Sequence, residues 1–470
     1  MIKPFLLGTD ALVFLLVGLV ALFAVYARKR EHLVAPWRDV VRSRIAVASL
    51  VVLTAYTLVG LLDSLHFRKA LPMQAGQQEV QYGGDVLSVL DVLLGPVRTQ
   101  VETTYSAPFA THLYAKEYML DEQGREVRGY PRLKYGGAHL SDPEIDKWPD
   151  IRRRVLLSVL ETLGVMLLIY VLFGALLARR WRKPVPVALR DIARGRCAVP
   201  WRTALGTLGA LVLLIALIAN MSAAWHMLGT DKVGQDVLYQ SIKSIRTGLV
   251  IGTLTTLIML PFAVLLGMMA GYFRGWVDDV IQYLYTTLNS IPGVLLIAAA
   301  VLMMQVYMAN HPEMFETMAE RADMRLLFLC MILGITSWTG LCRLLRGETL
   351  KLRELDYVQA GSAFGVSGFR IMMRHLLPNL MHLVMITVVL DFSGLVLAEA
   401  VLSYVGVGVD PTTMSWGNMI NRARLEMARE PMVWWSLLSA FVFMFTLVLA
   451  ANLFSDVVRD AFDPRLRTER

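Results

Sequence analysis

Long apolar runs separated by shorter polar segments dominate the chain. A helix needs about 20 apolar residues to cross the hydrocarbon core of a bilayer, and the runs reach or approach this length. They predict nine spans, at residues 5–26, 45–62, 155–178, 203–223, 247–271, 280–304, 325–345, 376–402 and 433–454. The pattern predicts an all-α, polytopic helical membrane protein with about nine transmembrane helices.

The end of the first run bears on whether it stays in the mature chain. This run ends in Arg28-Lys29-Arg30, and it has neither a preceding cationic region nor a small-residue cleavage site. We therefore expect a retained span and not a signal peptide.

Composition supports a membrane protein and restricts the partners. Of 470 residues, 56% are hydrophobic, a share that is high for a soluble domain. The formal net charge of +8 does not require nucleic acid, because cationic residues at span ends set topology. The three cysteines predict neither a disulfide framework nor a cysteine metal site, and the histidines show no paired ligand spacing. Methionine is frequent, but it packs apolar interiors more often than it binds metal.

The short loops give the orientation, because Lys and Arg concentrate on the cytoplasmic side. Linker 27–44 carries six such residues and linker 179–202 carries eight. Both should be cytoplasmic, together with residues 345–375 and the C-terminus, while the N-terminus and residues 63–152 lie outside. The run Arg152-Arg153-Arg154 opposes this assignment, but the cationic run at the other end of that span is larger.

The polar segment 63–152 is the one sizeable extramembrane region. Its glycine and proline pairs indicate turns, and it lacks long apolar periodicity. It could be a structural insertion or could contact a substrate or partner, and the sequence leaves both open. We therefore divide the chain into two N-terminal spans (1–62), an extracytoplasmic segment (63–152), a third span with a basic linker (153–202) and a core (203–470).

A distinctive cytoplasmic loop, residues 356–379, joins two spans of that core. Its first half predicts a short amphipathic helix that breaks at Gly365, since glycine permits a backbone reversal. A second short segment, 369–373, leads into the next span near Pro378. The apolar face of such a knob can lie on lipid headgroups or fill a groove in another protein. Physical reasoning alone leaves both possibilities open.

The loop resembles the EAA loop of binding-protein-dependent importer permeases. Gln359, Ala360 and Gly361 occupy its Glu-Ala-Ala positions, Gly365 its glycine, and His375-Leu376-Leu377-Pro378 its ending. The resemblance implies that these residues dock an ATPase. Gln359 lacks the usual negative charge and Gly361 replaces alanine, so a charge-assisted contact at Gln359 is not expected.

Further segments between Leu228 and Leu466 resemble the dipeptide, oligopeptide and nickel permeases of this family, and they occur along the chain in the same order as in that family. They are Leu228-Gly229-Thr230-Asp231, Gly234-Gln235-Asp236-Val237, Gly271 to Asp278, Ile291-Pro292, Ser415-Trp416-Gly417 and Arg459 to Arg465. The resemblance points to the second-permease kind, with a six-helix-type core preceded by three extra spans.

The resemblance also implies partners in a bacterial inner membrane. These are a second homologous permease, two ATPase subunits and an extracytoplasmic substrate-binding protein. The chain has no Gly-x-x-x-x-Gly-Lys-Ser/Thr motif. ATP and Mg²⁺ should therefore belong to the partner ATPase, with no cofactor and no enzymatic activity in this chain.

The expected cargo is a di- or oligopeptide, but nickel, a metal chelate or a peptide antibiotic fits the same kind of permease. Two alternatives belong to other classes of protein, a membrane-embedded hydrolase and a passive channel. No catalytic motif stands out to support a hydrolase, and the cytoplasmic knob argues against a channel.

Two acids in the eighth predicted span are candidates for the translocation pathway. Asp391 and Glu399 are eight residues apart, or about 12 Å along a helix. Intramembrane carboxylates are costly unless they face a cavity or a partner. The resemblance favours a structural role for Glu399, whereas Asp391 could attract the cationic groups of a peptide.

Overall fold

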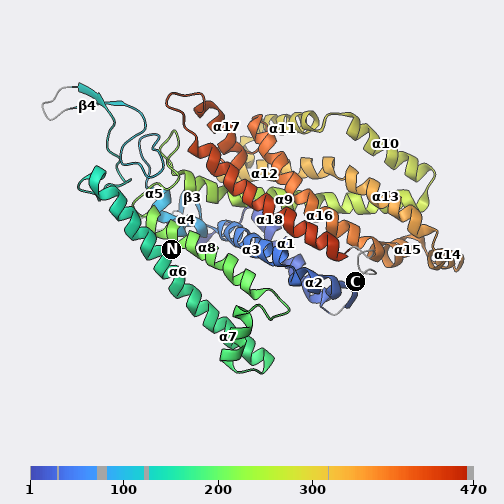
Figure 1. The fold of residues 1–470 in the computed structure, drawn as a ribbon. Coiled ribbons are helices and arrows are strands. Elements are labelled where there is room, and N and C mark those ends of the chain that lie inside the picture. The colour runs from blue at the N-terminus through green and yellow to red at the C-terminus, as the bar shows by residue number, and fades with distance from the viewer. Residues whose placement is uncertain (1, 29–30, 71–81, 121–125, 316, 463–470) are drawn as a thin grey trace, which may run out of the picture.

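The protein is described by a computed structural model that covers residues 2–28, 31–70, 82–120, 126–315 and 317–462 (Figure 1). Lys29, Arg30 and residues 463–465 of the last resembling segment lie outside it. Nine helices of the described part are long and apolar enough to cross a membrane, which confirms the predicted number of spans. They are α1 (Gly8–Ala27), α3 (Arg44–Asp63), α6 (Pro143–Trp181), α8 (Trp201–Ser222), α9 (Val237–Phe273), α11 (Gly293–Asn310), α12 (Met318–Ser337) continued by α13 (Thr339–Arg353), α16 (Leu377–Tyr404) and α18 (Trp435–Phe462).

The sixth span differs from its prediction of 280–304. Helix α10 (Trp276–Ser290) ends within that range, and α11 begins only at Gly293. Between them Ile291 is extended, with φ −91° and ψ 131°. The proline that follows disfavours a helical conformation at Ile291 and donates no backbone hydrogen bond, so the apolar run breaks into two helices. Of these two helices, only α11 is long and apolar enough to cross a membrane.

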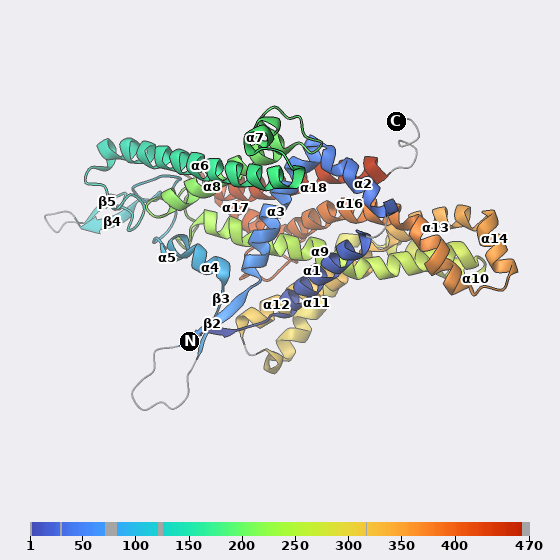
Figure 2. The same ribbon diagram turned by 90° about the horizontal axis from the view of Figure 1, so that it is seen from below.

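Helix α9 is the centre of the bundle and contacts α3, α12, α13, α16 and α18 (Figures 1 and 2). Glycines let α13 approach it closely. A Cβ at Gly267 would lie 2.8 Å from the Cys342 carbonyl oxygen, and one at Gly271 would lie 2.8 Å from that of Arg346. Small residues bring transmembrane helices together in this way, because dispersion contacts grow with close approach.

The N-terminal helices pack on the core instead of standing apart from it. Helix α1 contacts α12, and α3 contacts α8, α9 and α18. The short helix α2 (Glu31–Arg42) packs on the end of α18, where the Trp37 and Phe462 rings lie 5.7 Å apart. Helix α6 pairs with α8, and α7 (Val185–Ala193) packs against both.

The segment 63–152 contains short strands that the sequence did not predict. Strand β1 (Ile2–Pro4) pairs with β2 (His66–Ala70), which pairs with β3 (Tyr82–Ser88), all antiparallel. A second hairpin joins β4 (Glu117–Leu120) and β5 (Glu126–Gly129).

Two short helices, α4 (Val89–Leu93) and α5 (Gly95–Thr99), follow β3. The strands lie at the end of the bundle opposite the loop 356–379 (Figure 1). Outside the loop 356–379, the two remaining short elements are η1 (Pro312–Met314) after α11 and α17 (Trp416–Glu426) between α16 and α18.

Candidate functional site

The loop 356–379 forms the knob that the sequence predicts. It consists of α14 (Asp356–Ala363), α15 (Gly368–Ile371) and the π-helical turn η2 (Met372–Leu376), which runs into α16. Gly365 has φ +77°, a left-handed conformation that favours glycine, and it reverses the chain between α14 and α15. The knob lies at the tip of the bundle (Figures 1 and 2).

One side of the knob is fixed to the bundle. Val358 and Ile371 are buried in the same apolar cluster as residues of α9 and α13. Gly368 lies so close to the end of α9 that a Cβ there would be 2.8 Å from a ring carbon of Tyr272. The knob is thus continuous with α16 through η2 and wedged against α9, so it should move together with these helices.

The six predicted docking residues lie on or near the free side of this knob. Gln359, Ala360, Gly365 and Pro378 are exposed, whereas Gly361 and His375 are partly buried. The Gln359 amide donates to the Glu354 carbonyl oxygen at 3.1 Å. This geometry presents a neutral, small-residue surface where the family's pattern has a carboxylate.

Three further residues of the knob complete its surface, and the sequence did not single them out as site residues. Phe364 is 87% exposed and Phe369 is 64% exposed, so two aromatic rings project from the knob. Asn379 donates to the Tyr357 hydroxyl at 3.0 Å and to the His375 carbonyl oxygen at 2.8 Å, which joins α14 to the start of α16. The exposure of these two aromatic rings marks them as surface residues of the knob. Exposure is known only from the structure, so the sequence could not identify them.

The two intramembrane acids have different surroundings on α16. Glu399 is buried and accepts a 2.7 Å hydrogen bond from the Ser403 hydroxyl. It also lies against α17, since a Cβ at Gly417 would be 3.0 Å from its Oε1. Asp391 is partly exposed and has no hydrogen-bond or ion-pair partner among the described residues. The structure therefore does not bring the two carboxylates into one site.

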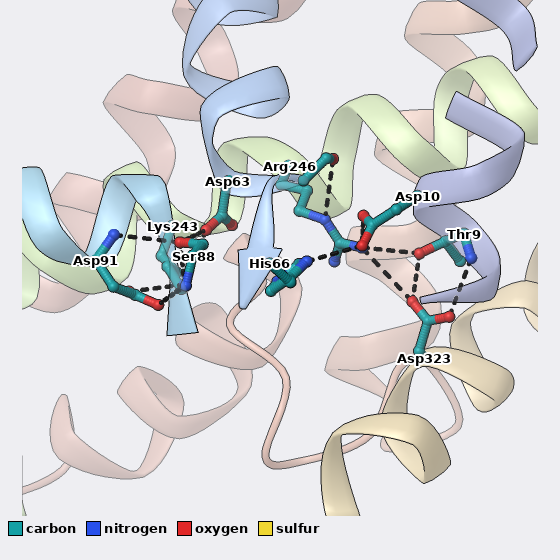
Figure 3. A network of polar contacts seen from close by, with 10 residues as sticks. Thr9, Asp10, Asp63, His66, Ser88, Asp91, Lys243, Arg246 and Asp323 are labelled. Atoms are coloured by element: carbon teal, nitrogen blue, oxygen red, sulfur yellow. Dashed lines mark hydrogen bonds and ion pairs between the residues drawn. The ribbon is translucent and has the colours of Figure 1, made fainter. Parts of the chain in front are cut away.

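A buried polar network near the start of α9 joins the N-terminal region to the core (Figure 3). Arg246 of α9 lies 2.7 Å from Asp10 of α1 and 3.5 Å from Asp323 of α12. Asp10 also contacts His66 of β2 at 2.7 Å, and the Thr9 backbone N–H donates to Asp323 at 3.0 Å.

Three residues before Arg246, Lys243 binds Asp63 at 2.8 Å and Asp91 at 2.7 Å. Burial alone would raise the pKa of Asp91. The Lys243 ammonium and hydrogen bonds from Ser88 and Tyr239 outweigh burial and hold that pKa below its ordinary value. A cavity of about 390 Å³ adjoins these pairs and is lined by charges of both signs. Sequence reasoning missed this network because its members lie far apart in the chain.

A second buried node fixes the segment 63–152 to the loop before α9. His226 lies 2.8 Å from Asp236 and 3.3 Å from Glu102, and Glu102 also accepts backbone hydrogen bonds from residues 134–136. Burial lowers the pKa of His226, but the two carboxylates outweigh it and raise that pKa to about 9. Burial raises the pKa of Glu102, but His226 and the backbone N–H groups lower it to about 2. The node is thus a buried ion pair over the ordinary pH range.

Comparison with known proteins identifies the family of this chain. Residues 263–468 match the model of the family described as "Binding-protein-dependent transport system inner membrane component". The oligopeptide transport system permease protein OppC of Mycobacterium tuberculosis (strain ATCC 25618 / H37Rv) is 31% identical over 245 residues, which cover 52% of this chain and 78% of the relative.

Two other relatives extend the likeness. The dipeptide transport system permease protein DppC of Bacillus subtilis (strain 168) is 29% identical over 245 residues, covering 52% of this chain and 70% of its own. The glutathione transport system permease protein GsiD of Pectobacterium atrosepticum is 28% identical, with 62% of this chain and 100% of the relative covered.

The helices of membrane-spanning length and the family match together identify a polytopic membrane permease. The chain belongs to the family of binding-protein-dependent transport system inner membrane components. It is therefore a multi-pass bacterial inner membrane protein of a transport family and not of an enzyme family. Membership of this family implies that an ATPase and a soluble binding protein work with it.

Proposed function

We propose that this chain is the second-kind permease of an ATP-driven importer for di- or oligopeptides. The relatives' names carry the substrate class, since they are oligopeptide, dipeptide and glutathione permeases. The chain would form half of the translocation pathway beside a second homologous permease. Nickel, metal chelates and peptide antibiotics are the competing cargoes within the same kind of transporter.

The knob 356–379 would be the contact with one of two ATPase subunits, which bind ATP and Mg²⁺. Its exposed rings, Phe364 above all, support this assignment. An aromatic side chain buries a large apolar area in a protein groove, and such rings commonly dominate interface energetics. Gln359, Ala360, Gly361, Gly365, His375 and Pro378 would shape the same surface, with no charge contact at Gln359.

The mechanism would be alternating access. Closure of the ATPase dimer would displace α14, and the apolar contacts of Val358 and Ile371 would transmit that displacement to α9 and α13. Asp391 would line the pathway and attract cationic groups of a peptide, whereas Glu399 would fix α16 to α17. The soluble binding protein would deliver substrate at the end that carries segment 63–152.

The test is co-purification of the ATPase with Phe364→Ser combined with Phe369→Ser. Loss of a buried aromatic anchor typically costs about 2 kcal/mol or more, so each substitution should weaken docking on the order of 30-fold. Tyr118→Ser is the matched control, because Tyr118 is 76% exposed on the hairpin at the opposite end. Full retention of the ATPase by the double variant would contradict the docking assignment.

Substrate class is tested separately by competition for uptake in cells that carry the complete transporter. Unlabelled dipeptides, tripeptides and longer peptides should displace a labelled peptide, and nickel should not. Displacement by nickel and not by peptides would reassign the cargo without affecting the docking result.

A further inference from the structure

Two basic linkers that are far apart in the sequence meet around one cavity. The cavity is about 630 Å³ in volume and lies where α2 passes into α3 and where α7 passes into α8. Four arginines line it: Arg42, Arg44, Arg194 and Arg202. Its other lining residues are Gly195, Cys197, Ala198, Pro200 and Thr203, so no carboxylate of the described part of the chain lines it.

The charge of this cavity is largely uncompensated. Within the described residues, Arg44, Arg194 and Arg202 form no hydrogen bond or ion pair through their side chains. Arg42 has a single partner, Asp39, at 3.6 Å on an exposed surface, where such a pair contributes little. The first residues of α3 and α8 also lie here, and the partial positive charge of a helix N-terminus adds to the same field.

An apolar groove continues directly from the arginine cavity. It is lined by Val34, Trp37, Arg38, Val41, Arg42, Ala198 and Val199, and it shares Arg42 and Ala198 with the cavity. A soluble anion would use only the cationic part. An amphiphile with an anionic head and a hydrocarbon tail matches both parts, and both linkers are on the side where the cationic loops of a membrane protein concentrate.

We propose that the arginine cavity and the apolar groove bind one anionic phospholipid of the cytoplasmic leaflet. Its phosphate lies among the four arginines, and an acyl chain lies along Val34, Val41 and Val199. Arginine suits this role because its planar guanidinium donates two parallel hydrogen bonds to a phosphate. Basic pockets between helices on the cytoplasmic side recognise lipid headgroups by this chemistry. The bound lipid would join the N-terminal spans to the third span and the core.

The test measures lipid retention by native mass spectrometry on the full chain, purified with the subunits that accompany it. Phosphatidylglycerol and phosphatidylcholine are added at equal concentration, and the chain should retain the anionic lipid preferentially. An arginine near the surface contributes about 1 kcal/mol to anionic lipid binding, or about a fivefold change in affinity. Arg194→Gln combined with Arg202→Gln should therefore weaken phosphatidylglycerol retention roughly 25-fold.

The matched control is Arg179→Gln combined with Arg190→Gln, which removes two charges from the same linker but none from the cavity. This control should retain the lipid at the wild-type level. Equal loss in both double variants, or equal retention of the two lipids, would overturn the proposal.

A third variant separates a lipid from a soluble anion. Val199→Asn keeps every arginine but makes the groove polar, so it should lower phosphatidylglycerol retention. Inorganic phosphate at millimolar concentration should not displace the lipid from the wild-type chain. Displacement by phosphate together with unchanged retention in Val199→Asn would reassign the cavity to a soluble phosphate compound and overturn the lipid.

Discussion

Arg246 is the residue that most directly connects the N-terminal spans to the core, since Asp10 and Asp323 belong to helices on either side of that boundary. A buried charge that loses its partner costs more than the pair itself contributes, because the remaining ion keeps its desolvation penalty. Removing one member of this network should therefore destabilise the fold more than the intact ion pairs stabilise it.

Arg246→Met should destabilise the chain by about 3–5 kcal/mol, because it removes the guanidinium that both Asp10 and Asp323 contact. The measurement is the midpoint of thermal unfolding of the detergent-purified chain. Arg246→Lys, which keeps the charge but not the fork of donors, should lose less. Equal midpoints for Arg246→Met and the native chain would show that the network contributes nothing.

His226 predicts a pH dependence. Its pKa is about 9 in the folded chain against an ordinary 6.5, so its contribution to stability is complete below pH 6.5 and is lost as pH rises through 9. Glu102 has a pKa of about 2 against 4.5, so its contribution is complete above pH 4.5 and is lost as pH falls through 2.

Stability of this node should therefore be highest between these limits, and a series of thermal midpoints from pH 6 to 10 measures the alkaline limb. His226→Gln should flatten that limb. A parallel fall of the variant and the native chain over the whole range would assign the alkaline loss to other groups.

At the scale of elements, the reversal at Gly365 sets the angle between α14 and α15. No atom lies within 4 Å of a Cβ built there, so a side chain meets strain only from the backbone conformation. That strain is about 1–2 kcal/mol for most residues and smaller for asparagine. The knob should consequently be sensitive to the kind of residue at position 365 and not to its size alone.

Gly365→Val should lower substrate-stimulated ATP hydrolysis by the assembled transporter severalfold, because α14 would be presented at a different angle. Gly365→Asn should keep most of that activity, since asparagine tolerates the left-handed region. Thermal midpoints of both variants are the control for folding. Native ATP hydrolysis in Gly365→Val would show that the φ of +77° is not needed for coupling.

The knob was predictable because every signal in it is local: the apolar face, the glycine and the proline are all within 24 residues. The network around Lys243 and Arg246 was not, because its partners are distant in sequence: Asp91 is 152 residues from Lys243, and Asp10 is 236 residues from Arg246. Pro292 could have indicated the break between α10 and α11. The apolar residues on both sides of it form one continuous run, however, and this run was predicted as a single span. The role of Asp391 depends on which helices form the pathway, and no local pattern encodes that.

At the scale of the whole molecule, the N-terminal region and the knob lie at opposite ends of the same central helix. Lys243 and Arg246 are near the start of α9, while its last residues contact the knob at Gly368. If a displacement of the knob moves α9, the polar network at the start of α9 must either move with that helix or break.

Asp391 provides the test of where the pathway runs between these ends. If its carboxylate faces the cargo, Asp391→Asn should reduce uptake of cationic peptides on the order of tenfold, because a hydrogen bond to a charged group contributes about 1.5 kcal/mol or more. Uptake of neutral peptides of equal length should stay nearly constant. Glu399→Gln is the matched control: its partners are Ser403 and α17, so any loss should be the same for both kinds of peptide. Unchanged selectivity in Asp391→Asn would remove this carboxylate from the pathway, and the unpaired acid would then need another explanation within α16.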